Sequence, residues 1–136
     1  MLKSMSVTGA DMKVGVDLDA TITAYPEFFS AFTAAMAAAG HEIHVITNRP
    51  PGTVDWIAGE LEGYGITWHA IHITRDKAAY IMAEGISALF DDMDEYFATL
   101  PEEVAVFKVR QHYNFDFVEH KWLCPARTTR LVEKIG

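Results

Sequence analysis

Short apolar runs alternate with longer segments of helical periodicity along most of the chain. The apolar runs have the length of β-strands and cover 14–16, 43–46, 66–73, 86–90 and 104–107. The segments that follow them repeat apolar residues three and four positions apart, which predicts helices at 26–39, 53–62, 74–84 and 127–135. Strands that alternate with helices are typical of an α/β fold in which helices cover both faces of a parallel sheet. We therefore expect one three-layer α/β domain over 1–136, with 1–12 as a flexible leader.

Proline, glycine and capping residues mark where several helices begin and end. Pro26 suits the first position of a helix, because that position needs no amide hydrogen. Gly63 and Gly65 are expected to end the second helix. Thr74 is expected to cap the third helix with its hydroxyl group, and Gly85 to end that helix.

Two aspartates follow directly after the first strand. Asp17 and Asp19 are two positions apart, and side chains i and i+2 of a strand point to the same side. We expect both carboxylates to face one small volume, where their like charges would repel. A divalent cation would relieve that repulsion, and clustered carboxylate oxygens suit a hard ion such as Mg²⁺. A solvated aspartate pair in a turn is the alternative.

Polar residues also follow the second and fourth strands. Thr47, Asn48 and Arg49 come after the second strand, and Asp91 and Asp92 come after the fourth. The carboxyl ends of parallel strands lie along one edge of the sheet, and open α/β folds bind their ligands at that edge. These residues are therefore candidates for a ligand site, and Arg49 is the best placed of them to contact a substrate.

Lys77 lies in the first turn of the third helix, where the helix dipole disfavours a cation. It is either a solvated surface lysine or an amine directed at a negative group.

His69 and His72 are three positions apart and would face opposite sides of a strand. They are a poor metal pair and fit surface or edge positions better.

Composition excludes several classes of protein. The chain has 136 residues, a net charge of −8 and no basic run, so we expect no general nucleic-acid binding. The single cysteine, Cys124, precludes an internal disulfide and fits a reducing, cytoplasmic environment. No apolar run approaches the roughly 20 residues that a membrane helix needs, so we expect no membrane span.

The candidate residues, taken together, resemble the four motifs of the haloacid dehalogenase (HAD) superfamily of phosphohydrolases. They occur in the order of that family: Asp17-x-Asp19-x-Thr21, then Thr47, Lys77 and Asp91-Asp92. The resemblance spans about 14–95 and implies a Rossmann-like sheet with strand order 3-2-1-4-5. Members of the family often carry a cap domain between these motifs, but neither gap here has room for one. We therefore expect no cap domain and an open site.

The same resemblance implies a mechanism. Asp17 would attack phosphorus and form an aspartyl-phosphate, and Asp19 would protonate the leaving oxygen and later activate water. Thr47 would hydrogen-bond the transferred phosphoryl group. Lys77 would neutralise Asp17 and the phosphate oxygens.

The resemblance also implies a Mg²⁺ cofactor. The ion would be held by the Asp17 carboxylate, the backbone carbonyl of Asp19 and either Asp91 or Asp92. The residues expected to contact the substrate are Thr21, Asn48 and Arg49.

Two positions refine the comparison with the family. The dehalogenases that give the family its name lack an aspartate at the position of Asp19, so phosphate chemistry is expected here. Many relatives carry glycine where this chain has Ala20, a change that costs little unless the backbone needs a positive φ.

The segment 104–114 resembles 5′-nucleotidase-like members. Residues nearby would either line the mouth of the site or pack as an ordinary tail: Tyr113, Asn114, Lys121, Trp122 and Arg127.

The sequence thus predicts a Mg²⁺-dependent phosphomonoester hydrolase. Its substrate would be a phosphorylated small molecule such as a nucleotide, or a larger phosphorylated substrate. A homo-oligomer could supply a lid. The alternative is a binding or regulatory module on a HAD scaffold that has lost turnover. A response-regulator receiver domain would place its acidic pair on the first strand and its phosphorylated aspartate on the third. This chain places its second acidic pair after Thr47 and Lys77, so that order does not fit.

Overall fold

The structure is a computed structural model that describes residues 11–123. The expected leader up to residue 10, Cys124, Arg127 and the helix expected at 127–135 lie outside the described residues. The strands are β1 (Lys13–Val16), β2 (Glu42–Thr47), β3 (Ala70–Ile73), β4 (Ala88–Asp91), β5 (Ala105–Lys108), β6 (Phe115–Asp116) and β7 (Lys121–Trp122). The α-helices are α2 (Pro26–Ala38), α3 (Val54–Tyr64) and α4 (Lys77–Glu84). A π-helical turn, η1, covers Leu18–Ile22, and a 3₁₀ turn, η2, covers Asp94–Tyr96.

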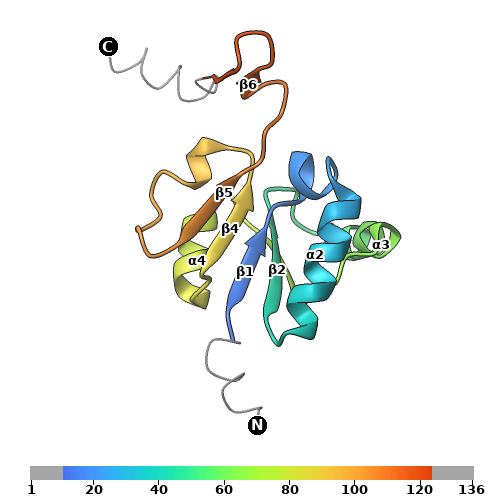
Figure 1. Cartoon of the computed structure of the whole chain (residues 1–136). Coiled ribbons are helices and arrows are strands. Elements are labelled where there is room, and N and C mark those ends of the chain that lie inside the picture. Colours follow the sequence, from blue (N-terminus) through green and yellow to red (C-terminus); the bar gives the residue numbers. More distant parts are fainter. Residues whose placement is uncertain (1–10, 124–136) are drawn as a thin grey trace.

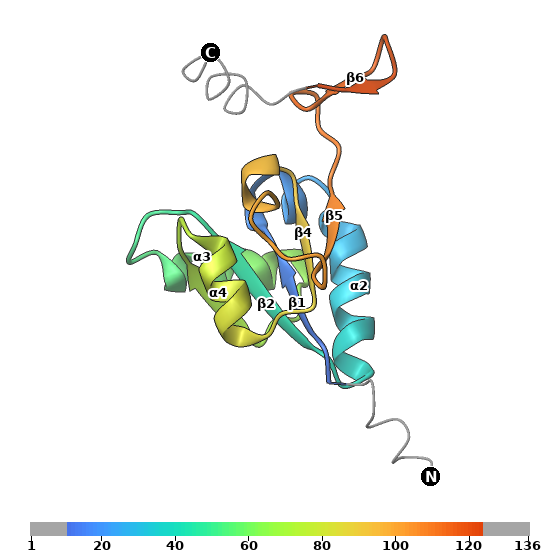
Figure 2. The ribbon, with the colours of Figure 1, turned by 90° about the vertical axis from the view of Figure 1, so that its left-hand side faces the viewer.

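Five strands form one parallel sheet in the order β3-β2-β1-β4-β5. Helices α2 and α3 lie on one side of this sheet and α4 lies on the other (Figures 1 and 2). The predicted α/β fold, with a parallel sheet between two helical layers, is therefore confirmed, as is the strand order that the resemblance implies. In such a sheet all five strands end at the same edge, which places the residues that follow β1, β2 and β4 close together.

Two apolar clusters hold the layers together. On one face, Val14 and Val16 of β1 pack with Ile57 and Leu61 of α3 and with Phe29 of α2. These side chains are 3% exposed or less, and burying each contributes roughly 1.5–3 kcal/mol of transfer free energy. The alternation of inward positions along β1 follows the period of two expected of a strand.

The second cluster covers the opposite face of the same strands. It joins Ile81 of α4 to Ile46, Ile86 and Leu89. Gly15 lies on this face of β1, and a Cβ atom there would stand 2.8 Å from the Ile46 side chain. The glycine thus allows neighbouring side chains to cross over the central strand, which explains why an apolar run is interrupted at its middle.

Helix ends differ in detail from the sequence predictions. The prediction that Thr74 caps the third helix is wrong, because Asp76 is the cap and its Oδ1 accepts a hydrogen bond from the Ala79 amide. α3 continues through Gly63 to Tyr64, and only Gly65, with φ of 76°, ends it. Glycine adopts this left-handed conformation without the steric cost of a side chain.

Met12, which the sequence prediction assigns to the leader, is bonded to the rest of the domain. The Met12 carbonyl accepts a hydrogen bond from the Glu42 amide, and its own amide donates to His41 Nδ1. Met12 therefore already continues the pairing of β1 with β2.

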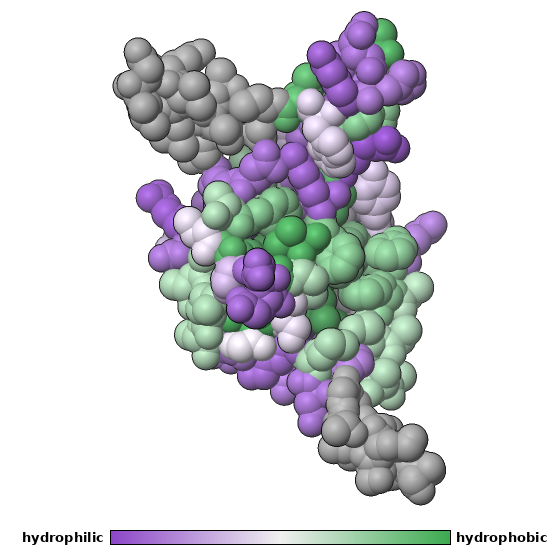
Figure 3. All heavy atoms as spheres, turned by 60° about the vertical axis from the view of Figure 1, so that its left-hand side comes forward, coloured by the Kyte–Doolittle hydropathy of each residue, from purple (hydrophilic) through white to green (hydrophobic). Residues whose placement is uncertain are grey.

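One part of the sheet keeps an apolar surface. β5 is an edge strand, and Val106 and Phe107 are 45% and 48% exposed. Beside it, Phe90 of β4, Phe107 and Phe28 of α2 line a groove, and apolar side chains gather on the face that Figure 3 shows. None of the helices in the described part of the chain is both long and apolar enough to span a membrane.

Candidate active site

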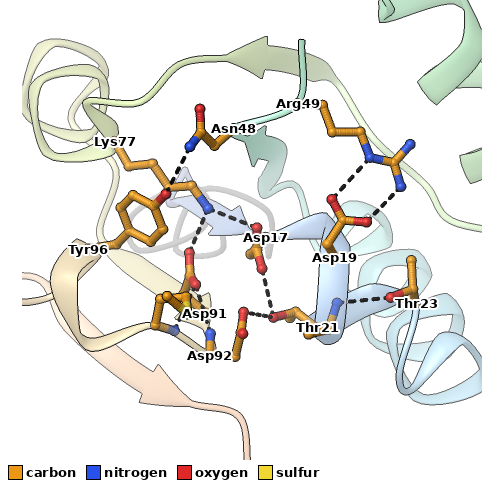
Figure 4. A network of polar contacts seen from close by, with 12 residues as sticks. Asp17, Asp19, Thr21, Thr23, Asn48, Arg49, Lys77, Asp91, Asp92 and Tyr96 are labelled. Atoms are coloured by element: carbon orange, nitrogen blue, oxygen red, sulfur yellow. Dashed lines mark hydrogen bonds and ion pairs between the residues drawn. The ribbon is translucent and has the colours of Figure 1, made fainter. Parts of the chain in front are cut away.

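The turn after β1 separates the two aspartates that the sequence places side by side. Strand β1 ends at Val16, so both aspartates lie beyond it: Asp17 precedes η1 and Asp19 lies inside this turn. The alternation of a strand does not extend to them, and their carboxylates bond different partners (Figure 4). Strand alternation therefore does not bring the two carboxylates together as was expected, although both residues line the same pocket.

Lys77 connects the carboxyl ends of two strands. Its Nζ donates to Asp17 Oδ1 at 2.8 Å and to Asp91 Oδ2 at 2.7 Å (Figure 4). The lysine is 1% exposed, so the reading as a solvated surface residue is excluded. Burial by itself lowers the pKa of Lys77, but the charges of Asp17 and Asp91 outweigh burial and raise it above the ordinary value. The ammonium is therefore fixed as a cation at the edge of the sheet.

Asp91 is held on both of its oxygens. While Oδ2 accepts from Lys77, Oδ1 accepts from the backbone amides of Asp92 and Met93 at 2.7 and 3.1 Å. The side chain is fully buried and does not line the pocket. Asp91 thus anchors Lys77 and shapes the loop after β4, whereas Asp92 faces the pocket.

Burial and the neighbouring carboxylates disfavour a negative charge on Asp92. Burial raises its pKa to about 8, helped by the hydrogen bond with Asp17 and by the charges of Asp17 and Asp91. Burial together with the charge of Asp17 also raises the pKa of Asp91 to about 6, and Lys77 offsets only part of this. Three carboxylates therefore share one ammonium, which leaves the group in need of a further cation or a proton.

Thr21 links two of these carboxylates through its hydroxyl group. Its hydroxyl lies 3.1 Å from Asp17 Oδ2 and 3.4 Å from Asp92 Oδ1. Thr21 is completely buried and does not line the pocket, so in this arrangement it positions carboxylates. The sequence analysis expected Thr21 to contact the substrate, but the structure does not place it where it would touch a ligand in this pocket.

A pocket of about 250 Å³ opens beside Asp17. Thr47, at the end of β2, and Asn48, in the loop that follows, both line it, as does Asp19. Two lining residues were not predicted: Tyr96, whose ring lies 4.2 Å from Lys77 Nζ and whose hydroxyl contacts Asn48 Nδ2 at 3.4 Å, and Met93. Tyr113 also lines the pocket.

Arg49 lies at the rim and bonds Asp19. Its Nη2 and Nε donate to the two Asp19 oxygens at 2.7 and 3.0 Å, and its Nη1 donates to Glu60 Oε1 at 2.8 Å. These hydrogen bonds, from Asp19 first and Glu60 second, raise the pKa of Arg49 further above its already high ordinary value. Arg49 is thus an intramolecular partner of Asp19 in this conformation.

Residues from the end of the described chain support the site. Asn114 is fully buried, and its Nδ2 donates to the backbone carbonyls of Asp92 and Val109 at 3.1 and 2.9 Å. Gln111 Nε2 donates to the Ala20 carbonyl at 2.7 Å. Neither contact has a signal in the sequence, because both join segments far apart along the chain. Lys121 and Trp122 lie in the β6–β7 hairpin, where Trp122 packs against Lys108.

The carboxylates fit a hard metal ion. Oxygens of Asp17, Asp91 and Asp92 lie within 4.8 Å of one another, and all three residues are buried. The raised pKa values of Asp91 and Asp92 show that the group lacks positive charge, which a divalent cation would supply. Among the described residues, the Asp19 carboxylate is not part of this group.

Comparison of the chain with protein-family models, with curated proteins and with solved structures found no match. Function must therefore be inferred from the site itself.

Proposed function

We propose that the protein is a magnesium-dependent phosphomonoester hydrolase that works through an aspartyl-phosphate on Asp17. One observation carries this proposal: the buried Lys77 ammonium bridges Asp17 and Asp91 beside the acidic Asp92, at the mouth of a pocket at the carboxyl edge of the sheet. A nucleophilic carboxylate needs an oriented oxygen and nearby positive charge to accept a phosphoryl group. Lys77 and Thr21 orient the Asp17 carboxylate through one hydrogen bond to each of its oxygens.

In the first step, a carboxylate oxygen of Asp17 bonds to phosphorus while the bond from phosphorus to the leaving oxygen breaks. The leaving oxygen takes a proton from the Asp19 carboxyl group. Lys77, through its positive charge, and the side chains of Thr47 and Asn48 would hold the oxygens of the transferred group. Mg²⁺, held by Asp17 and Asp92, would supply further positive charge to those oxygens.

In the second step, water attacks phosphorus and the bond from phosphorus to the Asp17 oxygen breaks. Asp19 takes the proton of that water, so the side chain returns to its starting form and inorganic phosphate leaves. Asp91 takes no direct part, because its side chain is fully buried and does not line the pocket. Its role is to position the lysine.

A binding module without turnover is the second candidate, and the position of Asp19 favours it. Both oxygens of the Asp19 carboxylate are bonded to Arg49, on the far side from Asp17 (Figure 4). Asp19 must leave Arg49 before it can deliver a proton to a leaving group. If it never does so, the pocket would bind a phosphorylated ligand and release it unchanged.

Phosphate release from a panel of phosphomonoesters tests the proposal. The panel contains nucleoside monophosphates, sugar phosphates and an aryl phosphate, each measured with and without Mg²⁺. We expect release that requires Mg²⁺ and falls by at least about 10³-fold in Asp17→Asn, since this change removes the nucleophile and keeps its shape. Asp55→Asn is the matched control, because Asp55 is exposed in the first turn of α3.

The outcomes separate the two candidates. Full activity in a folded Asp17→Asn protein would rule out the covalent mechanism. No release from any compound, together with measurable binding of the same compounds by calorimetry, would instead favour the binding module.

A further inference from the structure

The Arg49 guanidinium is built like a site for two anions. Its Nη1 and Nη2 face the Glu60 carboxylate at 2.8 and 3.3 Å, and its Nε and Nη2 face the Asp19 carboxylate at 3.0 and 2.7 Å. Each carboxylate occupies one edge of the planar group, which is the paired geometry in which arginine recognises carboxylates and phosphates. The two carboxylates differ in how firmly they are held.

Glu60 is the fixed partner. It lies within α3, its side chain is 24% exposed, and the Tyr64 hydroxyl, one turn later, donates to its Oε2 at 3.2 Å. Held in this way, Glu60 keeps Arg49 at the rim of the pocket whether or not the other edge is occupied.

Asp19 is the exchangeable partner. Its side chain is 60% exposed, and within the described residues only Arg49 bonds its carboxylate. Because the Asp19 carboxylate is already largely in contact with solvent, water solvates it once it leaves Arg49, and the incoming anion takes over both donors of that edge. An anion from solution would therefore compete with Asp19 for this edge of Arg49 at small cost.

The exchange also preserves the balance of charge at the rim. Arg49 faces two carboxylates now, and it would face one carboxylate and one ligand anion afterwards. Asp19 lines the pocket beside Asp17, so its carboxylate, once released from Arg49, is already at the edge of that pocket.

We propose that the edge of Arg49 now bonded to Asp19 is the binding site for a second anionic group of the substrate, a carboxylate or another phosphate. Binding of that group displaces Asp19 and frees its side chain for the pocket. This inference rests on the proposed hydrolase for its consequence, since it restricts the preferred substrates to phosphomonoesters that carry a second anion.

Two matched pairs of compounds test the inference and distinguish the two kinds of anion. The first pair is glycerol 3-phosphate and 3-phosphoglycerate, which differ by a carboxylate. The second is adenosine 5′-monophosphate and adenosine 3′,5′-bisphosphate, which differ by a phosphate. For at least one pair we expect kcat/KM to favour the member with the second anion by about tenfold or more in the wild type.

Three variants assign the effect to Arg49. Arg49→Gln is expected to bring the ratio close to one, and Arg49→Lys is expected to lower it also, because lysine keeps the charge but lacks the paired donors. Lys13→Gln removes a partly exposed positive charge at the start of β1 and should leave the ratio unchanged. A ratio that survives in Arg49→Gln but disappears in Arg75→Gln would overturn the proposal, since Arg75 lines a neighbouring hollow with Asn48 and Tyr96.

Affinity measurements test the anion site independently of the proposed hydrolase activity. Calorimetry with Asp17→Asn and the double variant Asp17→Asn/Arg49→Gln measures affinity for the same pairs without turnover. Tighter binding of the doubly anionic member that depends on Arg49 would support the anion site even if the wild type hydrolyses nothing. Equal affinity for both members of both pairs would overturn the inference, whether or not phosphate is released.

Discussion

Lys77 is a charged residue with the exposure of a core leucine, 1%. Moving an ammonium out of water is costly, and Asp17 and Asp91 offset that cost by hydrogen bonds of 2.8 and 2.7 Å. Well-packed apolar residues commonly stabilise a fold as well as such a buried group does, so its presence is a reason to look for chemistry at this point.

Removal of the Lys77 ammonium should destabilise the fold strongly. Lys77→Met is expected to lower the free energy of unfolding by about 3–5 kcal/mol at pH 8, because Asp17 and Asp91 remain buried without their cation. The loss should be smaller at pH 5, since the pKa of Asp91, already about 6, rises further without the ammonium and lets the carboxyl protonate. Urea unfolding at both pH values measures this. Lys13→Met is the control, because it removes a partly exposed ion pair in which Lys13 Nζ lies 3.6 Å from Glu84 Oε1. An equally small change in both variants would contradict the prediction.

Asp92 should make the metal-free protein less stable as pH rises. Its pKa is about 8 in the folded chain against 3.8 for the free group, so between these values the folded state binds more protons than the unfolded state. The free energy of unfolding therefore falls as pH increases from about 4 to about 8. Asp92→Asn removes this titration and should flatten the curve, most visibly above pH 6.

Unfolding measured from pH 5 to pH 9 in the presence of a chelator checks the prediction. Asp55→Asn, on the exposed side of α3, should keep the wild-type slope. A slope equally steep in Asp92→Asn would show that other groups carry the pH dependence.

At the scale of the element, η1 is the turn that distributes the site residues. Ala20 adopts φ of 64°, a conformation that costs an L-residue with a side chain roughly 1–2 kcal/mol. The Thr23 hydroxyl accepts from the Ala20 amide at 2.9 Å, and Gln111 donates to the Ala20 carbonyl at 2.7 Å. These two contacts hold the strained turn from both sides.

Glycine at position 20 should relieve that strain. Ala20→Gly is expected to stabilise the protein by about 0.5–1 kcal/mol, since the relief exceeds the extra entropy of glycine in the unfolded chain. The same exchange in a helix, Ala58→Gly in α3, should instead destabilise by about 1 kcal/mol. Urea unfolding of both variants gives the sign directly. Destabilisation in both would mean that the turn tolerates alanine without strain.

Local patterns predict the elements well and their junctions poorly. The apolar runs locate all five strands of the main sheet. Strands β1 and β2 are buried on both faces and need such a run, whereas β5 keeps one although Val106 and Phe107 are exposed. The cap of α4 was missed, since Thr74 and Asp76 both carry oxygens that cap helices and only the backbone path selects between them. The divergence of Asp17 and Asp19 was missed because β1 ends at Val16, before either aspartate, and η1 replaces the extended path that the alternation assumes.

Contacts across the whole molecule lie further beyond the reach of sequence patterns. The residues after β1, β2 and β4 could be expected at one edge, because parallel strands share their direction. Nothing in the pattern indicates that Asn114 holds the loop of Asp92, or that Glu60 holds Arg49. Such partners are set by how distant segments pack, so sequence patterns point to the candidate site residues and not to the residues that position them.

The acidity of the whole molecule also bears on the proposed binding of Mg²⁺. With a net charge of −8, the chain repels phosphorylated ligands unless positive charge is concentrated at the site. Asp17, Asp91 and Asp92 outnumber the one ammonium of Lys77 in their group. A divalent cation would neutralise this excess of negative charge and so lower the repulsion that a phosphate meets at the pocket.

Mg²⁺ should therefore stabilise the entire fold. A ligand that binds only the folded state adds about 2.7 kcal/mol to the free energy of unfolding at a concentration a hundredfold above its Kd, which corresponds to several degrees in Tm for a domain of this size. We expect Tm to rise with MgCl₂ beyond the rise given by NaCl at equal ionic strength. Asp92→Asn should lose most of the Mg²⁺-specific increase because it removes the carboxylate that faces the pocket, whereas Asp55→Asn should keep it. If wild type and Asp92→Asn shift equally, the ion binds elsewhere, and the three buried carboxylates would have to be balanced by Lys77 and protons alone.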